Sequence, residues 1–165
     1  TTRVERSFAF IDLSGFTRLT DDEGDDRAVE VLDTFRSAVR EVASARGVRV
    51  AKWLGDGAML VGVETEPLIE GIVDIEERIA GSGSPLALRA GLAVGPVILF
   101  EGDDYIGHPV NLASRLCDEA ADREVLAPAS AVAALRVETT VEPLGSRTIR
   151  GVAEPIELVR LGSSA

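Results

Sequence analysis

The stretch Phe8-Ala-Phe-Ile-Asp-Leu-Ser-Gly-Phe-Thr-Arg-Leu19 decides the fold, and the rest of the chain is organised around it. It begins as an apolar strand, carries the carboxylate of Asp12 at the end of that strand, and turns through Ser14-Gly15 into a helix. A carboxylate beside the exposed amides of a helix N-terminus suits a metal-bound phosphate. An ordinary strand-to-helix turn with a solvated Asp12 is the alternative, and other parts of the sequence decide between the two.

Length and composition narrow the class of protein. The chain has 165 residues, of which 45% are hydrophobic and 27% charged, so we expect a single globular domain over residues 1–165. A net charge of −11 argues against a nucleic-acid-binding protein, which needs a basic face. No apolar run reaches the ~18 residues of a membrane span, so a cytoplasmic protein without membrane contact is expected.

Cysteine and histidine usage restricts any metal site. Cys117 is the only cysteine and His108 the only histidine, which excludes an intrachain disulfide and a cluster of histidine ligands. A bound metal would therefore be a hard cation held by carboxylates, which points to Mg²⁺ or Mn²⁺.

The hydrophobic pattern predicts a split βαβ order, with a β-hairpin and two helices after the opening strand. The expected elements are a helix from Ala28 to Gly47, strands Val48 to Leu54 and Ala58 to Val63, a helix from Pro67 to about Gly81, a strand from Leu86 continuing to Phe100, a helix from Val110 to Ala121, and short strands after Val125. We therefore predict an α+β, ferredoxin-like fold whose antiparallel-rich sheet has helices on one face and short C-terminal strands.

In this topology Asp56, in the Gly55-Asp56-Gly57 turn of the hairpin, should approach Asp12. Without a neutralising His or Arg nearby, two such carboxylates repel each other unless a cation lies between them. Paired carboxylates that hold two metal ions are a recurring arrangement for displacement at phosphorus. Taken alone, Gly-Asp-Gly is also a common turn sequence.

Four further polar residues stand out. Asn111 and Arg115 are four residues apart, so they share one face of an otherwise apolar helix, where the arginine could bind phosphate or pair with a nearby acid. Lys52 is the only lysine of the chain and lies in a predicted strand, where a solvated side chain is the alternative. Asp104 ends a Gly-Asp-Asp turn, for which simple turn chemistry is the alternative.

Three motifs together resemble the catalytic domain of class III nucleotidyl cyclases, and more narrowly the compact mycobacterial adenylate cyclase domains. They are Phe10-Ile-Asp-Leu-Ser-Gly-Phe-Thr17, Lys52-Trp-Leu-Gly-Asp-Gly57 and Asp104-Tyr-Ile-Gly-His-Pro-Val-Asn-Leu-Ala-Ser-Arg115. Each motif is weak to moderate alone, but the three occur in family order, and the resemblance runs from Phe8 to Leu161. It implies the palm-like cyclase fold.

The resemblance implies roles for the first motif and the hairpin. Asp12 and Asp56 match the two metal-binding aspartates, with the Leu13 carbonyl as a further ligand of two Mg²⁺ or Mn²⁺ ions per site. The amides of the turn are expected to cradle the triphosphate, in agreement with the helix N-terminus noted above. The residues concerned are Ser14, Gly15, Phe16 and Thr17.

The resemblance also implies residues that recognise the adenine base and a residue that stabilises the transition state. Lys52 and Asp104 match the pair that reads the adenine edge, Asn111 the residue that orients the ribose, and Arg115 the residue that stabilises the transition state. Arg150 stands where the family usually has a lysine that grips the terminal phosphates. Pro96 stands where some members carry a phosphate-binding arginine, so that contact is expected to be missing or supplied differently.

In the family, the sites lie across a head-to-tail dimer with two-fold symmetry. The metal aspartates come from one subunit, and the base-reading, ribose and transition-state residues come from the other. A homodimer of this chain would hold two complete sites, and an isolated monomer should be inactive.

The expected activity is an adenylate cyclase that converts ATP to 3′,5′-cyclic AMP and pyrophosphate. Adenine offers an acceptor at N1 and a donor at its amino group, which suit Lys52 and Asp104, whereas guanine reverses both, so a guanylate cyclase is the less favoured alternative. The alternative outside the enzymes is a regulatory module that binds nucleotide and dimerises but has lost catalysis. Such relatives typically lose an aspartate, the asparagine or the arginine, and all are present here.

Overall fold

A computed structural model of the protein describes residues 2–102 and 104–162. Its helices are α1 (Phe16–Glu23), α2 (Asp25–Arg46), α3 (Thr65–Gly81), α4 (His108–Glu119) and α5 (Ala129–Val132). Its strands are β1 (Arg3–Leu13), β2 (Arg49–Trp53), β3 (Gly57–Gly62), β4 (Leu88–Phe100), β5 (Asp104–Ile106), β6 (Val125–Pro128), β7 (Thr140–Arg147) and β8 (Ile156–Gly162).

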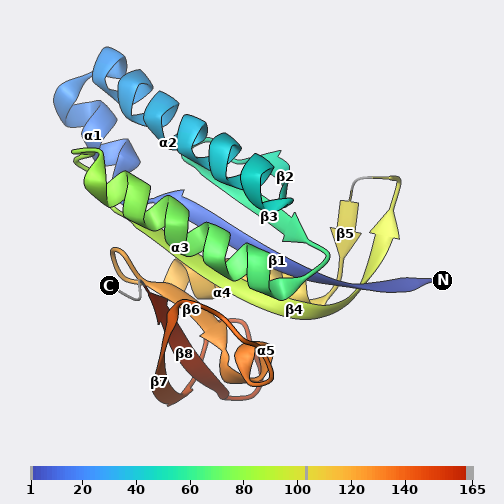
Figure 1. Ribbon diagram of the computed structural model, residues 1–165. Helices are drawn as coiled ribbons and strands as arrows, with labels where there is room; N and C mark the ends of the chain where they lie inside the picture. The colour runs from blue at the N-terminus through green and yellow to red at the C-terminus, as the bar shows by residue number, and fades with distance from the viewer. Residues whose placement is uncertain (1, 103, 163–165) are drawn as a thin grey trace.

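These strands form one mixed sheet in the order β2-β3-β1-β4-β6-β8-β7, and β5 pairs with the far end of β4. Strand β4 runs parallel to β6, whereas the other neighbouring strands are antiparallel. Figure 1 shows the end of β4 and β5 extending away from the helices. The long β1 lies between β3 and β4, so its last residues are enclosed on both sides by other strands.

Alternating residues of β1 belong to two separate apolar clusters, because successive side chains of a strand point to opposite faces. Ala9 and Ile11 pack in the cluster that includes α2 and α3, whereas Phe8 packs with Leu112 and Leu116 of α4. Helices α2 and α3 therefore cover one face of the sheet (Figure 1), and α4 covers the other.

Helix α4 lies very close to β4 at Gly91. A Cβ atom at this position would overlap the Ala113 carbonyl oxygen and the Cys117 amide nitrogen of the helix. At Gly95, an added Cβ would stand 2.8 Å from Cγ of Pro109, in the first turn of α4. The absence of side chains at two strand positions thus lets the helix backbone pack directly on the sheet.

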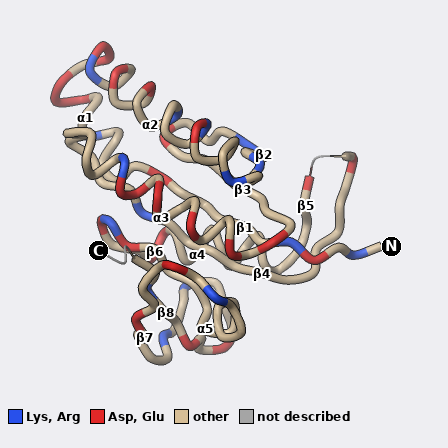
Figure 2. The backbone as a smooth tube through the Cα atoms, in the orientation of Figure 1, with Lys and Arg blue, Asp and Glu red and all other residues tan. Residues whose placement is uncertain are grey.

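Charged residues of both signs are interspersed along the helices (Figure 2). Some of them connect α2 to α3: Nη1 of Arg46 lies 3.2 Å from Oε2 of Glu70, and Nη1 of Arg78 lies 3.0 Å from Oε2 of Glu41. Exposed pairs of this kind each contribute little to stability. The apolar clusters therefore hold the helices on the sheet.

The structure confirms the predicted α+β class, the hairpin and the order of the main helices. Two details differ from the expectation. The helical region after Ser14-Gly15 is divided at Gly24, whose φ of 88° separates α1 from α2. Helix α4 lies on the face opposite α2 and α3, because the glycines of β4 admit it there.

We predict that Gly91→Ala lowers the free energy of unfolding by about 3 kcal/mol, because the added methyl group overlaps the backbone of α4. Urea denaturation measures the difference. Gly81→Ala is the control, since Gly81 ends α3 and a Cβ there meets open space. Equal stability of the two variants would contradict the close approach of α4 to β4.

Candidate active site

Asp12 lies between two cross-strand neighbours of very different size. In the antiparallel register, Asp12 of β1 is opposite Gly57 of β3 on one side and Arg89 of β4 on the other. A Cβ at Gly57 would stand 2.5 Å from the Ile11 carbonyl oxygen and 3.0 Å from Cβ of Asp12. Glycine therefore leaves the β3 side of Asp12 free of a side chain, whereas an arginine occupies the β4 side.

The hairpin turn brings Asp56 to the same place, as the sequence predicts. The Leu13 amide donates a hydrogen bond to the Asp56 carbonyl oxygen at 3.0 Å, which joins the turn to the end of β1. Asp12 and Asp56 both line a cavity of about 190 Å³, whose other lining residues include Ser114, Cys117 and Asp118 of α4 and its C-terminal turn. The two carboxylates thus share one cavity at the junction of β1, the hairpin and α4.

The Asp56 carboxyl is in an unfavourable position for a negative charge. Burial raises its pKa above the ordinary value, a hydrogen bond with its own backbone lowers it, and the charge of Asp12 raises it further. Arg89 offsets part of this effect. The balance of these effects is a raised pKa, so the site favours a bound cation or proton beside Asp56.

Arg89 corrects one expectation from the sequence, namely that no His or Arg neutralises the two carboxylates. Its Nε donates to Oδ1 of Asp12 at 2.7 Å and its Nη2 donates to Oδ2 at 3.3 Å. This hydrogen-bonded contact raises the pKa of the Arg89 guanidinium. The signal in the sequence was a single charged residue in the apolar run from Leu86 to Val94, but its partner depends on the register of β1 against β4.

The turn after Asp12 has the geometry of a helix N-terminus, with one amide already in use. Gly15 caps α1 with a φ of 85°, and the first amides of the helix, Phe16 and Thr17, have no acceptor within the helix. The Ser14 amide donates to the Ala87 carbonyl oxygen at 3.0 Å. The amide of Ser14 is therefore not available to a phosphate in this conformation, and the role of the other three residues stays a prediction.

Lys52 and Asp104 lie together, although they are far apart in the sequence. Nζ of Lys52 on β2 is 3.1 Å from Oδ1 of Asp104 on β5, and about half of each side chain is exposed. A cationic donor and an anionic acceptor therefore stand side by side at an accessible position. An exposed ion pair of this kind adds little stability.

Asn111 and Arg115 are both exposed on α4 and line a second cavity, of about 330 Å³. Gly151 lines it too, and a Cβ there would stand 2.7 Å from Cζ of Arg115, so the guanidinium lies directly on the backbone beside Arg150. Arg115 and Arg150 are not among the residues that line the Asp12–Asp56 cavity. The two cavities share Ser114 and Asp118, so Asn111 and Arg115 adjoin the Asp12–Asp56 cavity without lining it.

The carboxylates fit a hard divalent cation, but as an incomplete ligand set. Among residues 2–102 and 104–162, no group of three or more His, Cys, Asp or Glu side chains could hold a metal ion. Asp12 and Asp56 carry two negative charges against the single charge of Arg89. Mg²⁺ commonly binds through one or two carboxylates together with substrate phosphates, and the Leu13 carbonyl is adjacent. The donor set is thus suited to a metal ion whose remaining ligands are water or the phosphates of a substrate.

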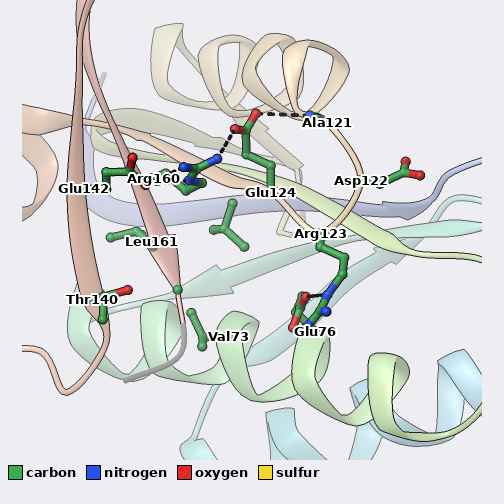
Figure 3. Close-up of a pocket in the computed structure, with 12 residues that line it drawn as sticks. Val73, Glu76, Ala121, Asp122, Arg123, Glu124, Thr140, Glu142, Arg160 and Leu161 are labelled. Carbon is green, nitrogen blue, oxygen red and sulfur yellow. Dashed lines mark hydrogen bonds and ion pairs between the residues drawn. The ribbon is translucent and has the colours of Figure 1, made fainter. Parts of the chain in front are cut away.

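A cavity of about 360 Å³ lies elsewhere, between α3, the loop before β6, and β7–β8 (Figure 3). Most of its charged groups pair with one another: Nε of Arg123 lies 2.6 Å from Oε1 of Glu76, and Arg160 reaches both Glu124 and Glu142. None of the residues that the sequence predicts to bind metal, bind nucleotide or take part in catalysis lines this cavity. Its paired charges point to a structural role.

Sequence comparison finds relatives over three quarters of the chain. The chain is 40% identical over 126 residues to an uncharacterized protein of Mycobacterium tuberculosis, covering 76% of this chain and 33% of the relative. It is 35% identical over 125 residues to an adenylate cyclase of Streptomyces coelicolor, covering 74% of this chain and 32% of that protein. No family model matches the chain.

Solved structures show the same fold. The adenylyl cyclase CyaB from P. aeruginosa has a TM-score of 0.79 at 22% identity and covers 99% of this chain and 96% of its own. The guanylate cyclase domain of RhGC from Catenaria anguillulae, in complex with GTP, has a TM-score of 0.84 at 19% identity, with 99% of each chain covered. The chain belongs to the class III nucleotidyl cyclases. It spans about a third of the length of the curated relatives named above.

Over residues 2–102 and 104–162, each helix is either too short or too polar to cross a bilayer.

We predict that Asp56→Asn stabilises this cyclase domain in the absence of metal. A carboxyl whose pKa is raised by folding contributes stability only when protonated, and that contribution is lost as the pH rises above about 4. The variant should therefore unfold at a higher temperature than the wild type near neutral pH, and the difference should shrink toward pH ~4. Thermal unfolding followed by circular dichroism at both pH values tests this.

The matched control is Asp122→Asn, an exposed aspartate in the loop before β6. If both variants had the same midpoint at neutral pH, the charge of Asp56 would not destabilise the fold.

Proposed function

We propose that the chain is an adenylate cyclase that converts ATP to 3′,5′-cyclic AMP and pyrophosphate and acts as a homodimer. The observation that carries the proposal is the convergence of Asp12 and Asp56 beside the N-terminus of α1, in a chain that belongs to the class III cyclases. The ribose 3′-oxygen would attack the α-phosphorus, and the bond from that phosphorus to the β-phosphate oxygen would break as pyrophosphate leaves. The proton of the 3′-hydroxyl would pass to solvent water in the same reaction.

Asp12 and Asp56, with the Leu13 carbonyl, would hold two Mg²⁺ or Mn²⁺ ions. When bound, these ions supply charge neutralisation at the phosphates and favour ionisation of the 3′-hydroxyl. The raised pKa of Asp56 supports this role, because a cation relieves the cost of its buried charge. The Phe16 and Thr17 amides would donate to phosphate oxygens at the start of α1.

The remaining groups would act on the nucleotide from the partner subunit of a head-to-tail dimer. Asn111 would orient the ribose, and Arg115 would donate to oxygens on which charge develops in the transition state. Arg150 would contact the terminal phosphates, with a planar fork in place of a lysine. Arg115 lines a cavity that adjoins the Asp12–Asp56 cavity of its own chain but does not line that cavity itself, as a site completed by a second chain requires.

The adjacent Lys52 and Asp104 favour adenine over guanine. The ammonium group can donate to N1 of adenine, and the carboxylate can accept from its amino group. Guanine presents the opposite groups and would leave both side chains without a suitable partner, which is costly. A guanylate cyclase is therefore the less favoured enzyme, although solved guanylate cyclase domains share the fold.

The alternative outside catalysis is a nucleotide-binding module that only dimerises. Every residue that the mechanism requires is present, which favours the enzyme. A direct assay separates the two.

We expect the purified protein to form cyclic AMP from ATP with Mn²⁺, and to prefer ATP over GTP by about 100-fold or more in kcat/KM. Asp12→Ala should abolish product formation, whereas Asp122→Ala should not. Chromatographic detection of both cyclic nucleotides measures the result. Absence of product from the wild type would favour the regulatory module, and equal use of both nucleotides would overturn the role of Lys52 and Asp104.

Arg115→Ala should lower kcat by roughly 100-fold to 1,000-fold and leave the affinity for ATP nearly unchanged. The reason is that Arg115 meets charge that exists only in the transition state. Steady-state kinetics and binding of a non-cyclisable ATP analogue provide the two values. An equal loss of binding and turnover would assign Arg115 to substrate binding instead.

A further inference from the structure

Arg89 makes three hydrogen bonds that connect Asp12 to α4. Two of them go to the two carboxylate oxygens of Asp12, at 2.7 and 3.3 Å. The third runs from Nη1 to the Asp118 carbonyl oxygen at 3.1 Å, in the C-terminal turn of α4. One guanidinium therefore contacts a carboxylate in the central strand and the end of the helix that carries Asn111 and Arg115.

We propose that Arg89 is a positioning residue that fixes the orientation of the Asp12 carboxylate for a divalent metal ion. The inference rests on the proposed function only in taking Asp12 as a metal ligand. It assigns Arg89 no contact with the nucleotide.

The geometry leaves Asp12 able to bind a metal while Arg89 holds it. A carboxylate has about four lone-pair positions on its two oxygens, and the guanidinium fork uses one on each. Strand β4, which carries Arg89, and strand β3, which follows Asp56, flank β1 on opposite sides. On the β3 side, Gly57 contributes no side chain. The remaining lone pairs of Asp12 are thus available toward Asp56.

Charge alone cannot explain an arginine at this position if Asp12 binds a metal. A positive group beside a metal site repels the cation and weakens its binding, whereas a rigid fork that fixes a ligand strengthens it. The two effects have opposite signs. Substitutions that keep the charge and remove the fork, or remove both, therefore distinguish them.

The main experiment measures binding of Mn²⁺ alone by the electron paramagnetic resonance signal of the free ion. It compares the wild type with Arg89→Lys, which keeps the charge and loses the fork, and Arg89→Gln, which loses both. We expect both variants to bind Mn²⁺ about 10-fold more weakly. In an Asp12→Asn background, Arg89→Lys should cause no further change, because Arg89 acts through Asp12.

The matched control is Arg123→Lys. Its guanidinium also pairs through Nε with a largely buried carboxylate, that of Glu76, but at the separate cavity of Figure 3. This variant should bind Mn²⁺ like the wild type. Thermal unfolding of each variant ensures that binding is measured on folded protein, and Arg89→Gln carries the test if Arg89→Lys does not fold.

Wild-type Mn²⁺ affinity in Arg89→Lys, or tighter binding in Arg89→Gln, would overturn the proposal, because only the charge would then matter. An equal loss in Arg123→Lys would also overturn it, since the effect would not be specific to Asp12. The binding assay is independent of catalysis. If the wild type forms no cyclic nucleotide but the Mn²⁺ results hold, the proposed function fails and the role of Arg89 stands.

Where the wild type is active, turnover gives a second measurement. Arg89→Lys should raise the Mn²⁺ concentration needed for half-maximal rate and recover much of its kcat at saturating Mn²⁺. An unchanged half-maximal concentration in an active variant would leave the cyclase assignment intact and remove the role of Arg89.

Discussion

Strand β1 pairs with β4 over Arg3–Leu13 and with β3 over Ser7–Asp12, and this double pairing before and at Asp12 is the constraint on which the site depends. Because successive side chains of a strand alternate between the two faces, a shift by one residue would move every side chain of β1 to the other face. Such a shift is prevented because alternate residues of β1 are buried in two different apolar clusters. The position of Asp12 between Gly57 and Arg89 is thus fixed by the burial of residues such as Phe8 and Ile11.

The stability of the fold and the chemistry of the site oppose each other at the end of this strand. The carboxylate of Asp56 is partly withdrawn from water beside a second carboxylate, which costs free energy while no cation is bound. The surrounding sheet tolerates the cost because the neighbouring residues Ile11, Ala58 and Leu88 are fully or almost fully buried. Because the cation-free site carries this free-energy cost, binding of a cation stabilises the folded protein by a larger amount.

Much of this arrangement could be predicted from the sequence because it depends on local patterns. Period-2 and period-3.6 spacing located the strands and helices, and the Gly-Asp-Gly turn placed Asp56 on a hairpin next to Asp12. The pairing of Lys52 with Asp104 was accessible only through the family resemblance. Arg89 was missed because it pairs with a residue 77 positions away, and register between distant strands is not a local property.

The glycines of β4 determine which amino-acid substitutions each face of the sheet can accept. On the face covered by α2 and α3, side chains fill the space between layers, so the loss of volume at one position can be compensated by a larger neighbour. On the face covered by α4, backbone meets backbone at Gly91, and no exchange of side-chain volume can compensate for an added methyl group. We therefore expect the first layer to accept varied apolar sequences, whereas α4 can be altered only on the sides turned away from β4.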